Sequence, residues 1–203
     1  MSVPEVVLAD YGAGNLRSVT SAFARAGVDA CVETDAAAIR EATLAVIAGV
    51  GHVESAARGL AGRGLDDAVR ERAAAGRPTL GICVGMQLLF EESDEGGSGL
   101  GLLRGPVRRL RARRVPHMGW NTLAVTKSEG LLAGLDGADV YFAHSFAAEP
   151  TDDGVTAATA EHDGRIVAAV ESGPLVGVQF HPERSGAAGA RLLADVVAWS
   201  RSA

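Results

Sequence analysis

The sequence predicts an α/β fold: a doubly wound, mainly parallel sheet with flanking helices and an added antiparallel portion. Three observations lead to this prediction. Short apolar runs alternate with helix-like periodicity over the first 92 residues, the runs are continuously apolar, and glycine-rich turns follow several of them. A length of 203 residues fits one domain, 1–203, with a sizeable buried core.

The first half of the chain reads as alternating strands and helices. Strands are expected at 5–9, 28–32 and 44–48, and helices at 16–26, 36–42 and 53–75, the last with glycine interruptions. Ligands bind beyond the carboxyl ends of strands in such sheets, so the turns at 10–15 and 49–51 draw interest. The turn at 10–15 lacks the full dinucleotide fingerprint and the P-loop lysine, which favours a simple tight turn. The glycines at 49–51 free the backbone to aim N–H groups, as an oxyanion hole requires.

The segment 78–91 has the layout of a nucleophile elbow. A short apolar run ends at Cys83, an apolar helical run from Val84 to Phe90 follows at once, and Gly81 and Gly85 flank the cysteine. The glycines allow a sharp turn where a Cβ would clash. A thiol at a helix N-terminus favours the thiolate, its reactive form. A buried structural cysteine explains these residues about as well.

The second half begins with an acidic loop at 91–99 and an arginine-rich run at 104–114. In that run, Leu110 and Ala112 alternate with arginines, which predicts an edge strand with a basic face; a partner surface or an anionic substrate is the alternative. Further strands are expected at 141–146 and 175–180, a hairpin at 155–160 and 165–170 turning at Asp163-Gly164, and a last helix at 187–199.

Residues 115–121 place large apolar and aromatic side chains around a glycine. Trp120 could anchor a partner interface, or it could fill a local core. From these residues alone we favour the local core.

His181 and Glu183 follow the last expected strand. Residues two apart in extended backbone point the same way, and Pro182 restricts His181 to extended conformations. The carboxylate could therefore orient the imidazole, giving a base with its orienter. An isolated pair of this kind usually lies at the surface without a catalytic role, but a cysteine at another strand end makes the catalytic interpretation stronger.

Composition narrows the class of protein. A net charge of −6 gives no general attraction to nucleic acid, and two cysteines, Cys31 and Cys83, form no disulfide framework. The N-terminus lacks the basic start of a signal peptide, and no apolar run reaches the roughly 20 residues of a membrane span. We therefore expect a cytoplasmic protein that binds neither membrane nor nucleic acid.

Taken together, these motifs resemble those of the class I, triad-type glutamine amidotransferases. Segments 81–87 and 177–183 match that family's nucleophile and base motifs. Within the family, segments 10–15, 116–121 and 181–186 are similar to the glutaminase subunits of imidazole glycerol phosphate synthases, which serve histidine biosynthesis. The match covers nearly the whole chain.

The resemblance implies a triad in which Cys83 attacks the side-chain amide of glutamine, His181 moves protons and Glu183 orients the imidazole. It implies that the N–H groups of Val50 and Val84 hold the oxyanion. The implied glutamine-binding residues are Gly49, Gly51, Gln87, Glu95, His144, Ser145 and Phe146. No metal and no cofactor are implied.

The resemblance also implies a partner. Ammonia would pass internally to a separate (β/α)₈-barrel cyclase, which makes imidazole glycerol phosphate and aminoimidazole carboxamide ribotide. The implied interface residues are Gly12, Asn15, Pro116, Met118, Trp120, Asn121 and Tyr141.

Two positions depart from the family pattern: Ala48 stands where proline is usual, and Phe146 where tyrosine is common. The Ala48 departure bears on the resting geometry of the oxyanion strand.

Three alternatives remain open: a glutaminase serving anthranilate or pyridoxal phosphate synthesis, an inactive homologue acting as a binding subunit, and an esterase or peptidase with a cysteine elbow. Segment 116–121 argues against the first, and the complete Cys83, His181 and Glu183 set argues against the second. The family motifs argue against the third.

Overall fold

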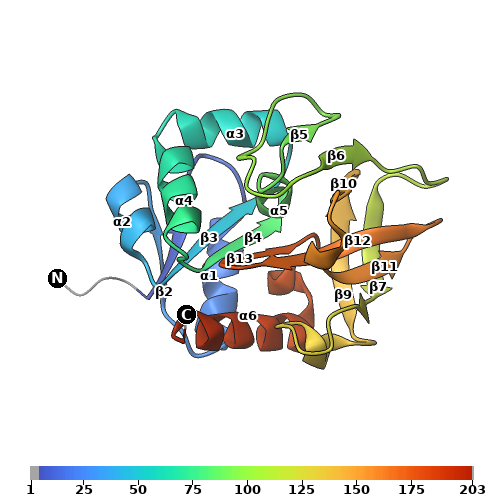
Figure 1. The fold of residues 1–203 in the computed structure, drawn as a ribbon. Coiled ribbons are helices and arrows are strands. Elements are labelled where there is room, and N and C mark those ends of the chain that lie inside the picture. Colours follow the sequence, from blue (N-terminus) through green and yellow to red (C-terminus); the bar gives the residue numbers. More distant parts are fainter. Residues whose placement is uncertain (1–4, 203) are drawn as a thin grey trace.

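The computed structural model describes residues 5–202 and confirms the predicted α/β class (Figure 1). The expectation about a leader peptide falls mainly on residues 1–4, which lie outside the described residues. Within 5–202, no helix combines the length and apolar character needed to cross a membrane.

An eight-stranded sheet forms the centre of the molecule. Its strands, in spatial order, are β2 (Ala30–Glu33), β1 (Val6–Ala9), β3 (Leu44–Gly49), β4 (Thr79–Cys83), β13 (Leu175–Val178), β12 (Arg165–Ser172), β11 (Thr156–Glu161) and β8 (Ala124–Val125). The pairs from β2 to β13 are parallel, and those from β13 to β8 are antiparallel. The chain passes from β1 to β2 on one side and then to β3 on the other, so the sheet is doubly wound, as predicted.

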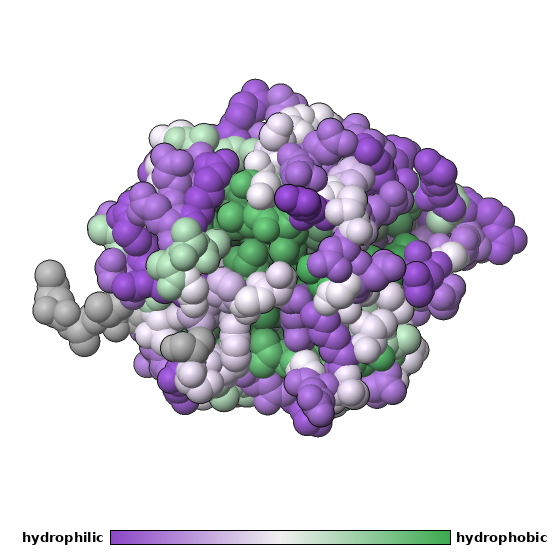
Figure 2. Space-filling view, viewed as in Figure 1, coloured by the Kyte–Doolittle hydropathy of each residue, from purple (hydrophilic) through white to green (hydrophobic). Residues whose placement is uncertain are grey.

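Helices cover both faces of the sheet (Figure 1). Helices α1 (Leu16–Arg25) and α6 (Gly186–Ser200) pack together on one face, and α2 (Ala36–Glu41), α3 (Val53–Ala61) and α4 (Leu65–Ala74) pack together on the other. The single interrupted helix predicted at 53–75 is two helices, because Gly64 takes the left-handed conformation at a φ of 66° and redirects the chain. Figure 2 shows apolar residues gathered over the strands between these layers, with hydrophilic residues covering most of the surrounding surface.

The core matches the apolar patterns read from the sequence. All of β1 is buried on both faces, as a continuous apolar run predicts for a central parallel strand. On α6, the predicted stripe of Leu192, Leu193, Val196 and Val197 is buried against the sheet. Burial of such side chains contributes about 25 cal/mol per Å² of apolar surface and is the main source of stability here.

Two smaller sheets extend from the carboxyl ends of the central strands. One contains β10 (Phe146–Ala148), β6 (Pro106–Arg109) and β5 (Glu92–Ser93), and the other is a ribbon of β7 (His117–Thr122) and β9 (Asp139–His144). The predicted basic edge strand is wrong in two respects: β6 lies in the middle of its sheet, and it ends at Arg109, before the alternating residues. The strand predicted at 141–146 is split at Ser145 into β9 and β10. Three short 3₁₀ turns, η1 (Ala133–Leu135), η2 (Asp153–Val155) and η3 (Pro182–Arg184), complete the fold with the single-turn helix α5 (Val84–Gln87).

Arg72 of α4 is a buried cation that the sequence did not reveal. The residue is fully buried, and its guanidinium donates to the carbonyl oxygens of Ile39 (2.9 Å) and Ala42 (2.7 Å). Further donations go to the carbonyls of Arg40 and Pro78. Burial lowers the pKa of Arg72 to about 10, so the group remains charged near neutral pH. A single arginine thus supplies hydrogen bonds to the end of α2 and the start of β4.

We expect Arg72→Ala to lower the free energy of unfolding by about 3 kcal/mol or more, because several buried carbonyl groups lose their donors at once. Arg70→Ala is the matched control on the same helix. Arg70 is partly exposed and pairs with Asp66 and Asp67, so its loss should change stability by at most about 1 kcal/mol. Urea unfolding of both variants tests this, and equal effects would contradict the role assigned to Arg72.

Candidate active site

The register of three parallel strands brings the candidate residues to one edge of the sheet. Gly49 at the end of β3 lies beside Cys83 at the end of β4, and Val178 of β13 lies beside Ile82. His181 therefore starts the segment that leaves the next strand end, close to the cysteine. The sequence could suggest that these residues lie at strand ends, but the order of the strands makes them neighbours.

Cys83 adopts the strained backbone of a nucleophile elbow. It has a φ of 56° and a ψ of −110°, a conformation that side-chain-bearing residues rarely take. The flanking glycines are required sterically: a Cβ on Gly85 would lie 1.7 Å from the carbonyl oxygen of Ile47, and one on Gly81 would lie 2.6 Å from that of Gly85. The helix after Cys83 is shorter than predicted, because α5 ends at Gln87 and not at Phe90. The sharp backbone turn at Cys83, and not a long following helix, therefore defines the elbow.

His181 and Glu183 form a buried pair behind the cysteine. Nδ1 of His181 lies 2.8 Å from Oε1 of Glu183, and both side chains are more than nine-tenths buried. The predicted contact is confirmed, but its geometry differs. His181 is extended, whereas Glu183 belongs to the 3₁₀ turn η3, so the turn and not a continuous extended chain brings the carboxylate to the ring.

The protonation of His181 is governed by these two neighbours. Burial lowers the pKa of its imidazole, but hydrogen bonds and negative charge from Cys83 and Glu183 outweigh burial and raise that pKa well above its ordinary value. The other oxygen of Glu183, Oε2, is buried without a hydrogen-bond partner among the described residues. The carboxylate charge is therefore directed mainly at the imidazolium.

A cavity of about 220 Å³ opens over Cys83. Its lining consists of Val50, Gly51, His52, Cys83, Val84, Gln87, Glu95, Pro116, Met118, Ala143, His144, Ser145 and Phe146. Sequence reasoning had singled out all of these except His52 and Ala143. The cavity is thus assembled from the turn after β3, the elbow, the acidic loop and the break between β9 and β10.

Glu95 fixes one wall of this cavity. Its Oε1 lies 2.9 Å from Nδ1 of His52, and its Oε2 accepts from the N–H of Val53 at 2.9 Å. These bonds tie the acidic loop to the beginning of α3. The residue predicted to contact glutamine therefore also holds the turn that follows Val50.

Two glutamine side chains connect the cavity to the cysteine. Nε2 of Gln87 donates to the carbonyl of Phe146 (2.8 Å) and to Oε1 of Gln179 (3.0 Å). Nε2 of Gln179 in turn lies 3.7 Å from the Cys83 sulfur. Gln179 was not predicted as a site residue, although it belongs to a recognised motif, because its place beside Cys83 depends on the pairing of β13 with β4.

Several predicted residues lie outside the cavity. Gly49 packs under Tyr11, whose hydroxyl would be 2.1 Å from a Cβ there and donates to the carbonyl of Ala48 at 3.0 Å. Gly12 and Asn15 shape the neighbouring turn, where the Asn15 side chain caps α1. Ala48, which stands where the family described above usually has proline, therefore accepts a hydrogen bond from a buried tyrosine.

The outer face of the β7–β9 ribbon is exposed beside the cavity. Met118 is 65% exposed and Trp120 is 60% exposed, which contradicts the local-core interpretation of Trp120. Trp120 and Tyr141 are edge to face, with centroids 6.1 Å apart, and Arg184 lies over the Tyr141 ring. Asn121 differs from them, because its amide points to the inner face and donates to the carbonyl of Glu161 at 2.8 Å.

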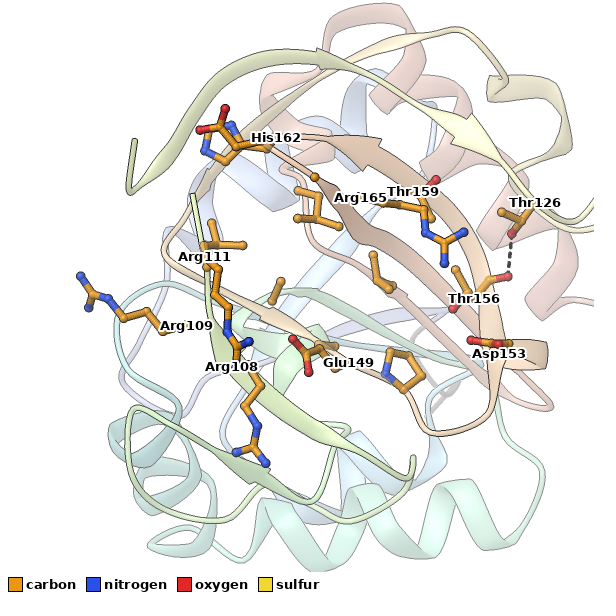
Figure 3. A pocket seen from close by; sticks show the side chains of 18 residues that line it. Arg108, Arg109, Arg111, Thr126, Glu149, Asp153, Thr156, Thr159, His162 and Arg165 are labelled. Carbon is orange, nitrogen blue, oxygen red and sulfur yellow. Dashed lines mark hydrogen bonds between the residues drawn. The ribbon is translucent and has the colours of Figure 1, made fainter. Parts of the chain in front are cut away.

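A larger groove of about 530 Å³ lies away from Cys83 (Figure 3). Arg108 and Arg111 lie on one side of it and Arg165 on the other, whereas Arg109 points away (Figure 3). Arg108 pairs with Glu92 and Asp94, so much of its charge is compensated within the protein. The smaller cavity is the better candidate because it holds the elbow cysteine. Within residues 5–202 no cluster of His, Cys, Asp or Glu suits a metal ion.

Comparison with known proteins gives consistent matches. The family described as "Glutamine amidotransferase class-I" matches residues 7–198. The chain is 45% identical to "Imidazole glycerol phosphate synthase subunit HisH" of Symbiobacterium thermophilum, covering 97% of this chain and 93% of that protein. It is 46% identical to the protein of the same name from Mycolicibacterium paratuberculosis, covering 95% and 97% of the two chains.

Solved structures share the fold at lower identity. One described as "Crystal structure of glutamine amidotransferase" has a TM-score of 0.76 at 21% identity and covers 96% of this chain and 99% of its own. The structure of PurLQS from Thermotoga maritima has a TM-score of 0.72 at 19% identity, covering 98% and 99% of the two chains. At these identities the comparison supports the fold alone and not a function.

We expect Glu183→Gln to lower the pKa of His181, because the amide keeps a hydrogen-bond acceptor but removes the adjacent negative charge. An NMR pH titration of ¹⁵N-labelled histidine measures this directly. Glu95→Gln is the control, since Glu95 contacts His52 and not His181. An unchanged His181 pKa in Glu183→Gln would contradict the electrostatic role given to the carboxylate.

Proposed function

The chain belongs to the class-I glutamine amidotransferase family, and we propose that it is the glutaminase subunit of an imidazole glycerol phosphate synthase of histidine biosynthesis. The observation that carries the proposal is the elbow at Cys83 with a buried His181–Glu183 pair on the adjacent strand end. Near full-length identity of about 45% to proteins named as that subunit supports the specific assignment.

In the first half-reaction, Cys83 acts as the nucleophile. The raised pKa of His181 keeps an imidazolium beside the sulfur at neutral pH. The thiolate is the form of a cysteine that acts as a nucleophile. The thiolate attacks the side-chain amide carbon of glutamine, and the carbonyl electron pair moves to oxygen. When the carbon–nitrogen bond breaks, His181 gives its proton to the leaving nitrogen. Ammonia departs and a glutamyl thioester remains.

Water completes the cycle. The neutral His181 now takes a proton from a water molecule that attacks the thioester carbon, and the carbon–sulfur bond breaks. Glutamate leaves and the thiolate is restored. Glu183 holds the ring orientation through both steps and stabilises the imidazolium when it forms.

In this proposal, the N–H groups of Val84 and Val50 donate hydrogen bonds to the oxyanion. Val84 follows Cys83 directly, and Val50 follows the strand end that is in register with it. Donors fixed before the reaction stabilise developing charge without reorganisation. The Gly51 φ of 95° gives the Val50 turn a conformation that other residues rarely adopt.

Glutamine is assigned to the cavity over Cys83. Gln87 and Glu95 supply polar groups on its walls, and the segment His144 to Phe146 supplies backbone and side-chain contacts at the break between β9 and β10. These polar groups and a volume of about 220 Å³ suit a ligand of amino-acid size.

In this proposal, ammonia passes to a separate (β/α)₈-barrel cyclase that docks on the exposed ribbon face. Met118 and Trp120 provide exposed apolar surface beside the cavity, as an interface anchor requires. Docking there would cover the cavity and keep ammonia from water, where it is mostly protonated and not nucleophilic. Tyr141, Pro116 and the turn containing Gly12 and Asn15 are proposed to extend the same surface.

We expect Cys83→Ala to reduce glutamine hydrolysis by about a thousandfold or more, because the covalent route is lost. The variant should still bind the cyclase, and the complex should make product from added ammonium salt at raised pH. Glutamate release and product formation are measured side by side. Normal glutamine turnover by the variant would refute the assignment.

We expect Trp120→Ala to weaken cyclase binding by about 2 kcal/mol, or roughly thirtyfold in Kd, because an aromatic anchor is removed. Stability should change by at most about 0.5 kcal/mol, since the side chain is mostly exposed. Val32→Ala is the control: Val32 is 41% exposed but lies on the opposite edge strand, β2. Unchanged affinity in Trp120→Ala, measured by calorimetry, would move the interface elsewhere.

A further inference from the structure

Three polar side chains form a continuous hydrogen-bonded line on the inner face of the ribbon. Nδ2 of Asn121 lies 3.1 Å from Nε2 of His117, and Nδ1 of His117 lies 2.9 Å from Nε2 of His144. Nδ1 of His144 lies 2.9 Å from the carbonyl oxygen of Phe146. The line starts on β7, crosses to β9 and ends on the cavity wall.

The chemistry of its two ends sets the direction of every bond. The Phe146 carbonyl can only accept, so Nδ1 of His144 carries the proton and, in the neutral ring, Nε2 accepts. Nδ1 of His117 must therefore donate, which leaves its Nε2 to accept from the amide of Asn121. That amide is itself oriented, because its oxygen accepts from the N–H of Thr122 and its nitrogen donates to the carbonyl of Glu161, both at 2.8 Å.

Burial favours the neutral form of both rings. His117 and His144 are buried, and His117 lies between Phe142 and His162, with ring centroids at 4.5 and 4.2 Å. Burial lowers the pKa of His144 to about 3. It also lowers the pKa of His117 to about 4, to which the charge of His162 contributes. Neutral rings each have one donor and one acceptor, as the line requires.

The line meets one glutamine side chain of the cavity at the Phe146 carbonyl. The Phe146 carbonyl accepts from both His144 and Gln87, and the second N–H of Gln87 goes to Gln179. Both donors of the Gln87 amide are thus occupied. Its carbonyl oxygen remains for the cavity, where it can accept from an ammonium or amide N–H group of a substrate.

We propose that His117 and Asn121 are positioning residues, which orient the Gln87 amide toward bound glutamine through His144 and the Phe146 carbonyl. Neither residue reaches the reacting atoms. The proposal rests on the glutaminase function assigned above, but the hydrogen-bonded line itself can be tested without activity.

The first test is ¹⁵N NMR of the wild-type chain labelled at histidine, at pH 7. Two-bond correlations should show both His117 and His144 as neutral Nδ1–H tautomers. An Nε2–H tautomer at either ring, or a charged ring, would overturn the proposal even if the enzyme is fully active. A wild-type complex that releases no glutamate from glutamine would instead refute the proposed function.

The second test is steady-state kinetics in the cyclase complex. His117→Phe keeps the stacked ring but removes both bonds, so the KM for glutamine should rise roughly three- to tenfold while kcat changes less than about twofold. His117→Asn restores a donor near the Nδ1 position and should recover most of the affinity. His162→Phe keeps the stack without belonging to the line and should leave KM unchanged.

Asn121→Asp covers the case in which a buried His117 variant fails to fold. Asn121 is partly exposed, and aspartate matches its shape but cannot donate to His117. The KM should rise in this variant too, with cyclase affinity unchanged because Asn121 lies on the inner face. Unchanged KM in Asn121→Asp and His117→Phe, or an equal rise in His162→Phe, would show that the line serves only folding.

Discussion

The close approach of the Cys83 turn to β3 is the constraint on which the site depends. No side chain fits at Gly85, because the carbonyl of Ile47 occupies that space, and a Cβ at Gly81 would clash with the backbone of Gly85. This contact holds the ends of β3 and β4 together and accompanies the positive φ of Cys83. A Cβ at Gly85 would push the Cys83 turn away from the end of β3, which carries the turn assigned to the oxyanion. Packing at backbone level therefore precedes any chemistry at the sulfur.

Buried polar groups are satisfied in two different ways around this centre. Arg72 keeps its charge and donates hydrogen bonds to backbone carbonyls, so it needs no buried counter-ion. His117 and His144 lose their charge and satisfy each other. The His181–Glu183 pair differs from both, because a buried carboxylate faces the imidazole and leaves one of its oxygens without a partner among the described residues. Of these three cases, only the His181–Glu183 pair places a carboxylate against a basic ring, and it does so beside Cys83.

The β7–β9 ribbon separates two roles by the simple alternation of a strand. His117 and Asn121 face inward and reach the cavity wall through hydrogen bonds, whereas Met118 and Trp120 face outward and remain exposed. Adjacent residues of a strand point to opposite faces, so one short segment can shape a pocket and display an apolar surface. This arrangement explains why residues 115–121 combine large apolar and aromatic side chains with polar ones.

The sequence by itself determined the parallel α/β core and the sharp turn at Cys83, because both are local signals. Continuous apolar runs predicted strands buried on both faces, and the glycines around Cys83 predicted an elbow. The structure shows that a Cβ at Gly81 or Gly85 would clash with the backbone. The contact of His181 with Glu183 was also predictable, since only two residues separate them in the chain. Such features depend on spacing within one segment.

Only the tertiary structure decided what depends on contacts between distant segments. The exposure of Trp120 and the hidden cation at Arg72 depend on what packs against them, which composition does not reveal. Gln179 joined the site because β13 pairs with β4, and the arginine run failed as an edge strand because other strands flank β6. The line from Asn121 to His144 exists only because β7 and β9 pair in one register. Strand order and register come from the packing of the whole chain, so no single segment can encode them alone.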